Sequence, residues 1–166
     1  MKPLTVYTAA SFRLLHAVQL FHEALRHRIP DVQILDWTDR AAPPEGLAPD
    51  QRRRWFDAAG GQVYEFCADA CANADVVVYL GASGQDAGVE VGLAAGAGTP
   101  VMGVRGPLEA PGLMLHGAVA LWCCDIQEAV RVLTRLGQCR GCWACGQPCA
   151  GCKARHICNL PVSWRE

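Results

Sequence analysis

Six cysteines are concentrated at the C-terminal end of the chain, at spacings typical of metal ligands. They follow the pattern C-x2-C-x2-C-x3-C-x2-C-x5-C and are Cys139, Cys142, Cys145, Cys149, Cys152 and Cys158. The residues between them include almost no aliphatic side chains, so apolar burial alone cannot fold this segment. Thiolate coordination supplies the missing folding free energy in small zinc modules that are unfolded without metal. We therefore expect a metal-binding tail over residues 138–166.

The cysteine spacing fits two kinds of metal centre. The C-x2-C pairs Cys139 with Cys142 and Cys149 with Cys152 make a four-thiolate site, and a structural zinc is the first expectation. The run from Cys139 to Cys149 also has the C-x2-C-x2-C-x3-C spacing of bacterial ferredoxins, so an iron–sulfur cluster is the alternative. The few cationic residues around Trp143 would suit a nucleic-acid-binding knuckle, but ordinary solvated charges explain them better.

A second set of residues that could do chemistry is spread over the first hundred positions. It combines carboxylates, hydroxyls, a guanidinium and a glycine: Tyr7, Ser11, Arg13, Asp75, Ser83, Asp86, Gly88 and Glu90. Carboxylates can act as nucleophiles or as general acids and bases, and a guanidinium beside a hydroxyl and a helix N-terminus suits a phosphate. Whether these residues meet depends on the elements that position them.

Strand and helix patterns alternate along residues 1–137. The expected strands are Leu4–Thr8, Val32–Leu35, Asp75–Leu80, Pro100–Val104 and Val119–Trp122, and the expected helices are Phe12–Arg26, Asp50–Ala74, Asp86–Gly96 and Asp125–Leu136. Asp50 and Asp86 are candidate N-caps, and Gly60 with Gly61 suggests a break in the second helix. The alternation predicts one α/β domain with a doubly wound parallel sheet of about five strands.

The composition sets limits on function. The chain has 166 residues, 51% hydrophobic and 19% charged, with a net charge of -1, which excludes a disordered chain and a broadly basic nucleic-acid binder. No apolar run reaches the roughly 18 residues of a membrane span, and we expect a cytoplasmic protein without membrane contact. Reduced thiols are the rule there, so metal ligation is favoured over disulfides. Outside the tail, we expect Cys67 and Cys71 to be small buried apolar side chains.

Ligands of such sheets bind beyond the carboxyl ends of the strands. The turns after Thr8 and Leu80 would meet there, with two helix N-termini offering free N–H groups to an anion. We expect this edge to gather six of the polar residues: Tyr7, Ser11, Arg13, Asp75, Asp86 and Glu90. Taken singly, each has an ordinary structural explanation, as a core tyrosine, a cap or a solvated helix residue. Together they indicate a binding or catalytic site.

Three segments of the sequence carry a family resemblance. VYTAASFR, ANADVVVYLG and DAGVEVGLAAGAGTPV, within residues 3–104, resemble the nucleoside 2-deoxyribosyltransferase family, including its 2′-deoxynucleoside 5′-monophosphate N-glycosidase branch. The resemblance implies a flavodoxin-like fold and assigns Glu90, in the G-x-E-x-G-x-A pattern at residues 88–94, as the nucleophile. It implies that Tyr7 holds this carboxylate and that Asp75 handles protons or the sugar.

The turn A-S-F-R resembles the monophosphate branch more than the transferases. By this resemblance Ser11 and Arg13 would bind a 5′-phosphate, with further donors from Ser83 and from the backbone near Asp86 and Gly88. We therefore expect an N-glycosidase or deoxyribosyl transferase acting on a small-molecule nucleoside or its 5′-monophosphate, without a cofactor at the catalytic site, and assembled as a homodimer. The alternatives are a non-catalytic nucleotide sensor and a redox or nucleic-acid-binding protein that acts through the tail.

Overall fold

The computed structural model describes residues 3–107 and 109–143, the last stretch from residue 139 onward by its backbone alone. Four of the predicted metal ligands, Cys145, Cys149, Cys152 and Cys158, therefore lie outside the described residues. Cys139 and Cys142 fall in the backbone of the last helix. The metal site and the domain boundary at residue 137 stay predictions.

The described chain alternates strands and helices around one parallel sheet. The strands are β1 (Thr5–Ala9), β2 (Gln33–Leu35), β3 (Val76–Leu80), β4 (Val101–Val104) and β5 (Leu121–Cys123). The helices are α1 (Leu15–Arg28), α2 (Pro49–Asn73), α3 (Gln85–Ala97), α4 (Leu113–Ala118) and α5 (Ile126–Trp143), and a short 3-10 turn, η1 (Phe12–Leu14), precedes α1. The strand order is β2-β1-β3-β4-β5, with every neighbouring pair parallel. This is the flavodoxin-like order, and it confirms the predicted doubly wound sheet.

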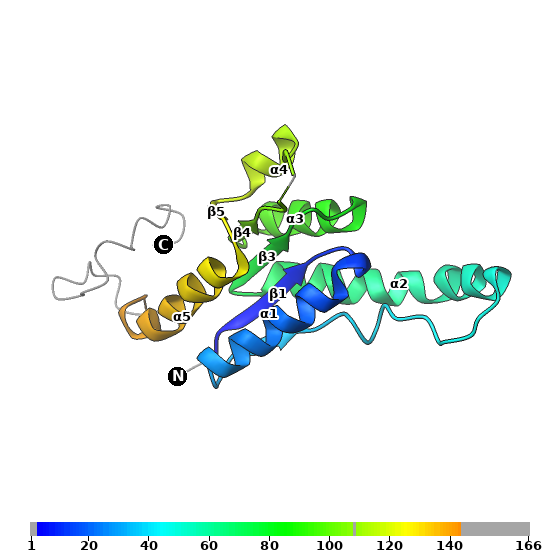
Figure 1. Ribbon diagram of the computed structural model, residues 1–166, viewed down its shortest axis with the longest axis horizontal. Helices are drawn as coiled ribbons and strands as arrows, with labels where there is room; N and C mark the ends of the chain where they lie inside the picture. Colours follow the sequence, from blue (N-terminus) through cyan, green and yellow to red (C-terminus); the bar gives the residue numbers. More distant parts are fainter. Residues whose placement is uncertain (1–2, 108, 144–166) are drawn as a thin grey trace.

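Helices cover both faces of the sheet (Figure 1). One face carries α1 and α5, which contact each other, and the other carries α2, α3 and α4, which pack in sequence. Successive strands are added to the sheet in opposite directions from β1: β2 lies on one side of β1, and β3 lies on the other. The strand order therefore reverses between β1 and β3. Ligand sites in open α/β sheets form beyond the carboxyl ends of the strands at such a point.

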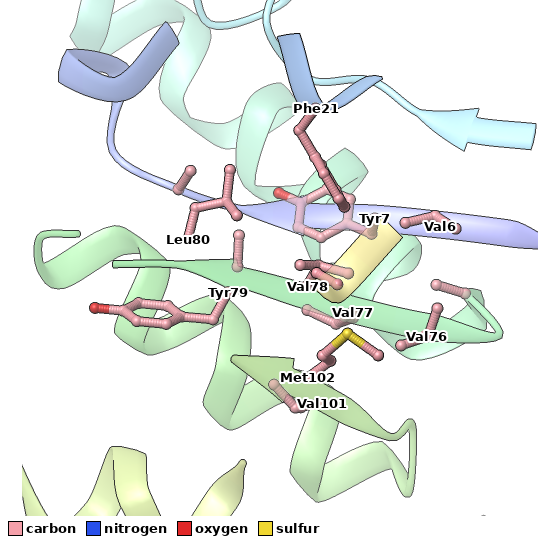
Figure 2. Close-up of a cluster of buried hydrophobic side chains, with 14 of the residues drawn as sticks. Val6, Tyr7, Phe21, Val76, Val77, Val78, Tyr79, Leu80, Val101 and Met102 are labelled. Carbon is pink, nitrogen blue, oxygen red and sulfur yellow. The ribbon is translucent and has the colours of Figure 1, made fainter. Parts of the chain in front are cut away.

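The two central strands form the core of the domain. Every residue of β1 and of β3 is buried, which suits the β-branched run of β3 because a parallel strand covered on both faces has no solvent side. Figure 2 shows Tyr7 and Tyr79 within this core, with their hydroxyls pointing toward the carboxyl ends of the strands. Tyr7 is paired in register with Val77, so Tyr79 lies two residues farther along on the neighbouring strand and on the same face.

Helix α2 differs from its prediction. It runs without interruption through Gly60 and Gly61, both exposed, because a glycine in an exposed helix costs only about 1 kcal/mol and the buried second half of the helix holds the rest. The predicted cap was also wrong. Ala48 occupies the N-cap position and its N–H donates to the Gln51 side chain, while Asp50 lies in the first turn and pairs with Arg54.

Two further helix boundaries and one short helix were not predicted. Helix α3 begins after Gly84, which takes the N-cap position that we assigned to Asp86. The six-residue α4 is too short to show a helical period in the sequence. Helix α5 continues to Trp143 rather than ending at Leu136. None of the described helices is long and apolar enough to cross a membrane.

Candidate functional site

A buried hydrogen bond joins Tyr7 of β1 to Glu90 of α3. The Tyr7 hydroxyl donates to Oε1 of Glu90 at 2.5 Å, although the two residues are far apart in sequence. Tyr7 is fully buried and Glu90 is 9% exposed. The other carboxylate oxygen, Oε2, is buried and finds no hydrogen-bond partner among the described residues. The structure thus brings together two of the three predicted catalytic residues and leaves one buried oxygen of the carboxylate without a hydrogen bond.

Burial dominates the protonation of this pair. Desolvation raises the pKa of Glu90 to about 7, against the lowering effect of the Tyr7 hydrogen bond and of the neighbouring Cys67 thiol, and the nearby Asp86 carboxylate raises it further. Burial and the neighbouring Glu90 also raise the pKa of Tyr7, so its hydroxyl keeps its proton and remains a donor. Glu90 therefore changes charge near neutral pH, where a glutamate in water is fully ionised.

The thiol of Cys67 belongs to the same cluster. It comes from α2 and interacts with both Glu90 and Tyr7, while burial raises its pKa to about 11 and keeps it a neutral thiol. Cys71, one turn later, is fully buried near Glu90. The prediction of small buried side chains is correct for both, but it missed the contact of Cys67 with the carboxylate. The signal available in the sequence was the position of Cys67 on the apolar face of the predicted helix, which is the face expected to point inward.

The turns after β1 and β3 are joined by two serines. Ser11 caps η1, and its N–H donates to Oγ of Ser83 at 2.8 Å. Oγ of Ser83 in turn donates to the Leu80 carbonyl, and its N–H donates to the Tyr79 hydroxyl. The prediction that these turns meet is confirmed. Both hydrogen-bond donors of Ser83, its N–H and its hydroxyl, are used inside the protein. Ser83 therefore holds Ser11 in place more than it offers hydrogen bonds to a ligand.

Three other predicted residues lie near the N-termini of the two site helices. Arg13 is exposed on η1, and its backbone N–H donates to the Ser11 hydroxyl at 3.3 Å. Asp86 and Gly88 are exposed in the first turns of α3, next to N–H groups that have no acceptor within the helix. Asp86 adds a negative charge beside Glu90. An anion bound here would meet Arg13 and the α3 N-terminus from opposite sides of the switch point.

Asp75 lies at the amino end of β3, so the expectation that it gathers at the carboxyl edge of the sheet was wrong, and its catalytic role stays a prediction. It precedes β3, so it lies at the amino end of a strand whose carboxyl end is about 16 Å away at 3.3 Å per residue. Its carboxylate accepts the N–H of Thr5 at 2.7 Å, and its own N–H donates to the Thr5 carbonyl. Asp75 ties the starts of β1 and β3 together. The error came from treating a residue at the start of a parallel strand as if it lay at the end.

A second tyrosine–glutamate pair lies on the same face of the sheet and was not predicted. The Tyr79 hydroxyl donates to Oε1 of Glu109, which follows β4, and Oε2 of Glu109 accepts the N–H of Gly106 at 3.1 Å. Burial and Glu109 raise the pKa of Tyr79 to about 12. Only the position of Glu109 in a loop after a parallel strand could have drawn attention to it.

The opposite face of β1 carries a polar chain that resembles a catalytic triad. His22 of α1 lies 3.0 Å from the Thr8 hydroxyl and 3.3 Å from the Asp36 carboxylate. Thr8 and His22 are almost completely buried, and the Thr8 carbonyl accepts the indole N–H of Trp37 at 2.7 Å. The Thr8 hydroxyl is already engaged by His22 inside the protein, so we assign the chain to anchoring β1 against α1 and the segment after β2.

Residues that could hold a metal do not gather in this part of the molecule. Among the described side chains of residues 3–107 and 109–138, no three histidine, cysteine, aspartate or glutamate side chains form a cluster suited to a metal ion.

Comparison with solved structures finds the same fold in two enzymes. A 2-deoxyribosyltransferase from Bacillus psychrosaccharolyticus superposes with a TM-score of 0.54 and 17% identity, over 76% of this chain and 90% of that one. The Clostridium botulinum CMP N-glycosidase BcmB superposes with a TM-score of 0.51 and 13% identity, over 78% of this chain and 97% of that one. Comparison with family models and with curated proteins finds no match. The expected flavodoxin-like fold is confirmed.

Proposed function

We propose that this protein cleaves the N-glycosidic bond of a nucleoside, or of a nucleoside 5′-monophosphate, with Glu90 as the nucleophile. The observation that carries the proposal is the buried Tyr7–Glu90 hydrogen bond, which fixes one carboxylate oxygen and leaves Oε2 unpaired within the described part of the chain. The two structural neighbours, a deoxyribosyltransferase and a CMP N-glycosidase, support the reaction class. The roles of Glu90 and Tyr7 follow the family pattern in the sequence, and the contact between the two residues supports them.

In the first step, Oε2 of ionised Glu90 attacks the anomeric carbon of the sugar. A carbon–oxygen bond forms as the carbon–nitrogen bond breaks, and the electron pair of the broken bond leaves with the base. The transition state has oxocarbenium character, so the carboxylate also stabilises the positive charge that develops on the sugar. Tyr7 keeps Oε1 in place during the attack, and this prevents the carboxylate from rotating away.

In the second step, water or another nucleobase attacks the glycosyl–Glu90 ester. The carbon–oxygen bond to Glu90 breaks, its electron pair returns to the carboxylate, and the sugar leaves as a free sugar or as a new nucleoside. The attacking group gives up a proton, and the departing base gains one. Asp86 is the exposed carboxyl closest in sequence to Glu90, on the preceding turn of α3, and it is our candidate for this proton transfer.

A 5′-phosphate would be bound between the turn after β1 and the N-terminus of α3. The Arg13 guanidinium, the Ser11 hydroxyl and the first N–H groups of α3 present positive charge and donors to it. A nucleoside without phosphate leaves these groups in water and gains nothing from them. We therefore propose the 5′-monophosphate as the preferred substrate.

The experiment follows free base by chromatography. Wild type and Glu90→Ala are incubated with the common ribo- and 2′-deoxyribonucleosides and with their 5′-monophosphates. The proposal predicts base release by wild type, its loss in Glu90→Ala, and preference for a monophosphate. Absence of release from every substrate by folded wild type would contradict it and would favour a ligand sensor.

We further propose that the protein is a cytoplasmic homodimer whose tail cysteines bind a structural zinc. For the dimer, the support is the exposed face of α3, where Gly88, Gly92 and Gly96 recur at every fourth position. Beyond its sequence neighbours and the backbone of its own helix, a Cβ at any of them would meet no atom of the described residues within 4 Å, so packing inside the described chain does not require glycine there. Light scattering of the full chain tests the dimer, and metal analysis tests the zinc.

A further inference from the structure

A continuous chain of hydrogen bonds runs from the loop after β4 to the turn after β1. It begins at Glu109, which accepts the Tyr79 hydroxyl proton, and Tyr79 accepts the N–H of Ser83 at 3.1 Å. Ser83 then accepts the N–H of Ser11 at 2.8 Å. These links cross the carboxyl ends of β4, β3 and β1. They connect a carboxylate that touches none of the predicted site residues to the serine that would bind phosphate.

Backbone packing holds the first part of this chain tightly. A Cβ at Gly81 would collide with the Glu109 carboxylate and with the backbone of Gly106, and a Cβ at Gly106 would collide with the backbone of Gly81 and Ala82. Both positions therefore need glycine, because the loops after β3 and β4 lie directly against each other. The close approach lets Glu109 reach past Gly81 to Tyr79.

The direction of each hydrogen bond follows from the groups involved. An ionised carboxylate only accepts, so Tyr79 must give its proton to Glu109. With that proton committed, the Tyr79 oxygen offers a lone pair to the N–H of Ser83, which can only donate. Ser83 gives its hydroxyl proton to the Leu80 carbonyl and offers its own lone pair to Ser11. Every donor in this chain of hydrogen bonds has an acceptor, so only one orientation of the Ser83 hydroxyl satisfies all of them.

We propose that Glu109 and Tyr79 are positioning residues for the phosphate end of the substrate, acting through Ser83 on Ser11. They set the place of the Ser11 turn relative to the N-terminus of α3, and with it the discrimination between a 5′-monophosphate and the nucleoside. This inference rests on the proposed function, since it refines how that site recognises phosphate. The Tyr7–Glu90 pair, which acts at the anomeric carbon, is a separate device.

The test measures binding in the absence of turnover. The four common 2′-deoxynucleoside 5′-monophosphates and their parent nucleosides are titrated into Glu90→Ala protein by calorimetry, with and without Tyr79→Phe or Glu109→Gln. Tyr79→Phe keeps the ring that packs edge-on against Trp122 and removes only the oxygen. We expect it to weaken monophosphate binding about tenfold and nucleoside binding less than twofold, as expected for a lost hydrogen bond that leaves a partner unpaired. Glu109→Gln should act in the same direction.

Two controls separate positioning from general damage. Tyr64→Phe makes the same chemical change on an exposed tyrosine of α2 and should leave both affinities unchanged. Ser83→Ala combined with Tyr79→Phe should cost no more than the larger single change, because both act through the same chain. A simple loss of stability would not select for the phosphate-bearing ligand.

Each outcome decides the inference. A selective loss of monophosphate affinity supports it, and that support holds even if wild type releases no base, in which case the proposed reaction alone fails. An equal loss for both kinds of ligand, no loss in either variant, or a parent protein that binds monophosphates no more tightly than nucleosides would overturn it. In all three of these cases, base release by wild type would still support the proposed reaction.

Discussion

Two tyrosine–glutamate pairs on one face of the sheet make the same hydrogen bond in different surroundings. Tyr7 and Glu90 come from β1 and α3 and are buried together, and Oε2 of Glu90 has no partner among the residues that the structure describes. Tyr79 of β3 is also buried, but its partner Glu109, in the loop after β4, is partly exposed and uses both oxygens of its carboxylate.

The difference shows how environment assigns a role to a carboxylate. Burial with one unsatisfied oxygen costs free energy in the ionised state, and that cost is recovered when the oxygen meets a positive centre such as an oxocarbenium carbon. A carboxylate with both oxygens satisfied has little to gain from a substrate, but it holds its neighbours firmly. We therefore assign reaction to the first pair and positioning to the second.

The largest expected effect separates the two glutamates. Glu90→Gln removes the nucleophile and should lower the rate of base release at least about a thousandfold. Glu109→Gln leaves the reacting atoms alone and should lower it less than about tenfold at saturating substrate. Chromatographic base release with matched protein concentrations measures both. Similar losses in the two variants would remove the distinction between the pairs.

The next effect concerns the pH dependence of the reaction. Glu90 must be ionised to attack, so kcat/KM should rise with pH and reach half of its plateau near the carboxyl pKa of about 7 in the substrate-free protein. Tyr7→Phe removes a hydrogen bond that lowers this pKa, and should move the midpoint upward by roughly one unit. Tyr79→Phe should leave the midpoint unchanged. A pH–rate profile of each variant checks this, and a midpoint near 4.5 in wild type would contradict the burial argument.

A smaller effect appears in the stability of the fold. The Glu90 pKa is raised from 4.5 to about 7 in the folded protein, so the unfolded state loses its proton first and the folded state is destabilised as pH rises through this range. Between pH 5 and pH 8, wild type should lose on the order of 1 to 3 kcal/mol of unfolding free energy that Glu90→Gln retains. Denaturant unfolding at both pH values measures this, with Glu109→Gln as the control that still shows the wild-type pH dependence. A wild type as stable at pH 8 as at pH 5, relative to Glu90→Gln, would argue against a buried and protonated Glu90.

The smallest effect is expected from metal removal. If the tail binds a structural zinc, chelation should release the metal and leave the rate of base release within about twofold, because the described side chains of residues 3–107 and 109–138 form no metal site. Metal analysis before and after chelation, together with the base-release assay, tests this. Loss of turnover that zinc restores would link the tail to the reaction.

The order of elements could be predicted because local patterns specify it. Buried β-branched runs mark β1 and β3, and the pairing of these two strands follows from the alternation of strands and helices. Tyr7 and Glu90 were found by their match to a family pattern, and the fold then showed that they touch. Helix breaks were less predictable, since two adjacent glycines in α2 have no visible effect on an exposed stretch of helix.

The site could be predicted only where a local signal exists. Asp75 was misplaced because a residue at the start of a parallel strand was grouped with residues at the carboxyl ends, where ligands bind. Glu109 and Cys67 were missed because their importance comes from contacts made by distant elements: a loop packed against Gly81, and an inward turn of α2. Such contacts depend on how loops and helices pack against the sheet, and the spacing of residues in the sequence does not predict them.

The most direct test of the account is to trap the sugar on the enzyme. Wild type is mixed with a 5′-monophosphate substrate, quenched in acid within the first turnover, digested and mapped by mass spectrometry. We expect one sugar phosphate attached to the peptide that contains Glu90, present also in Glu109→Gln and absent in Glu90→Gln. An adduct on any other residue, or undiminished base release by folded Glu90→Gln, would contradict the assignment of reaction to the Tyr7–Glu90 pair.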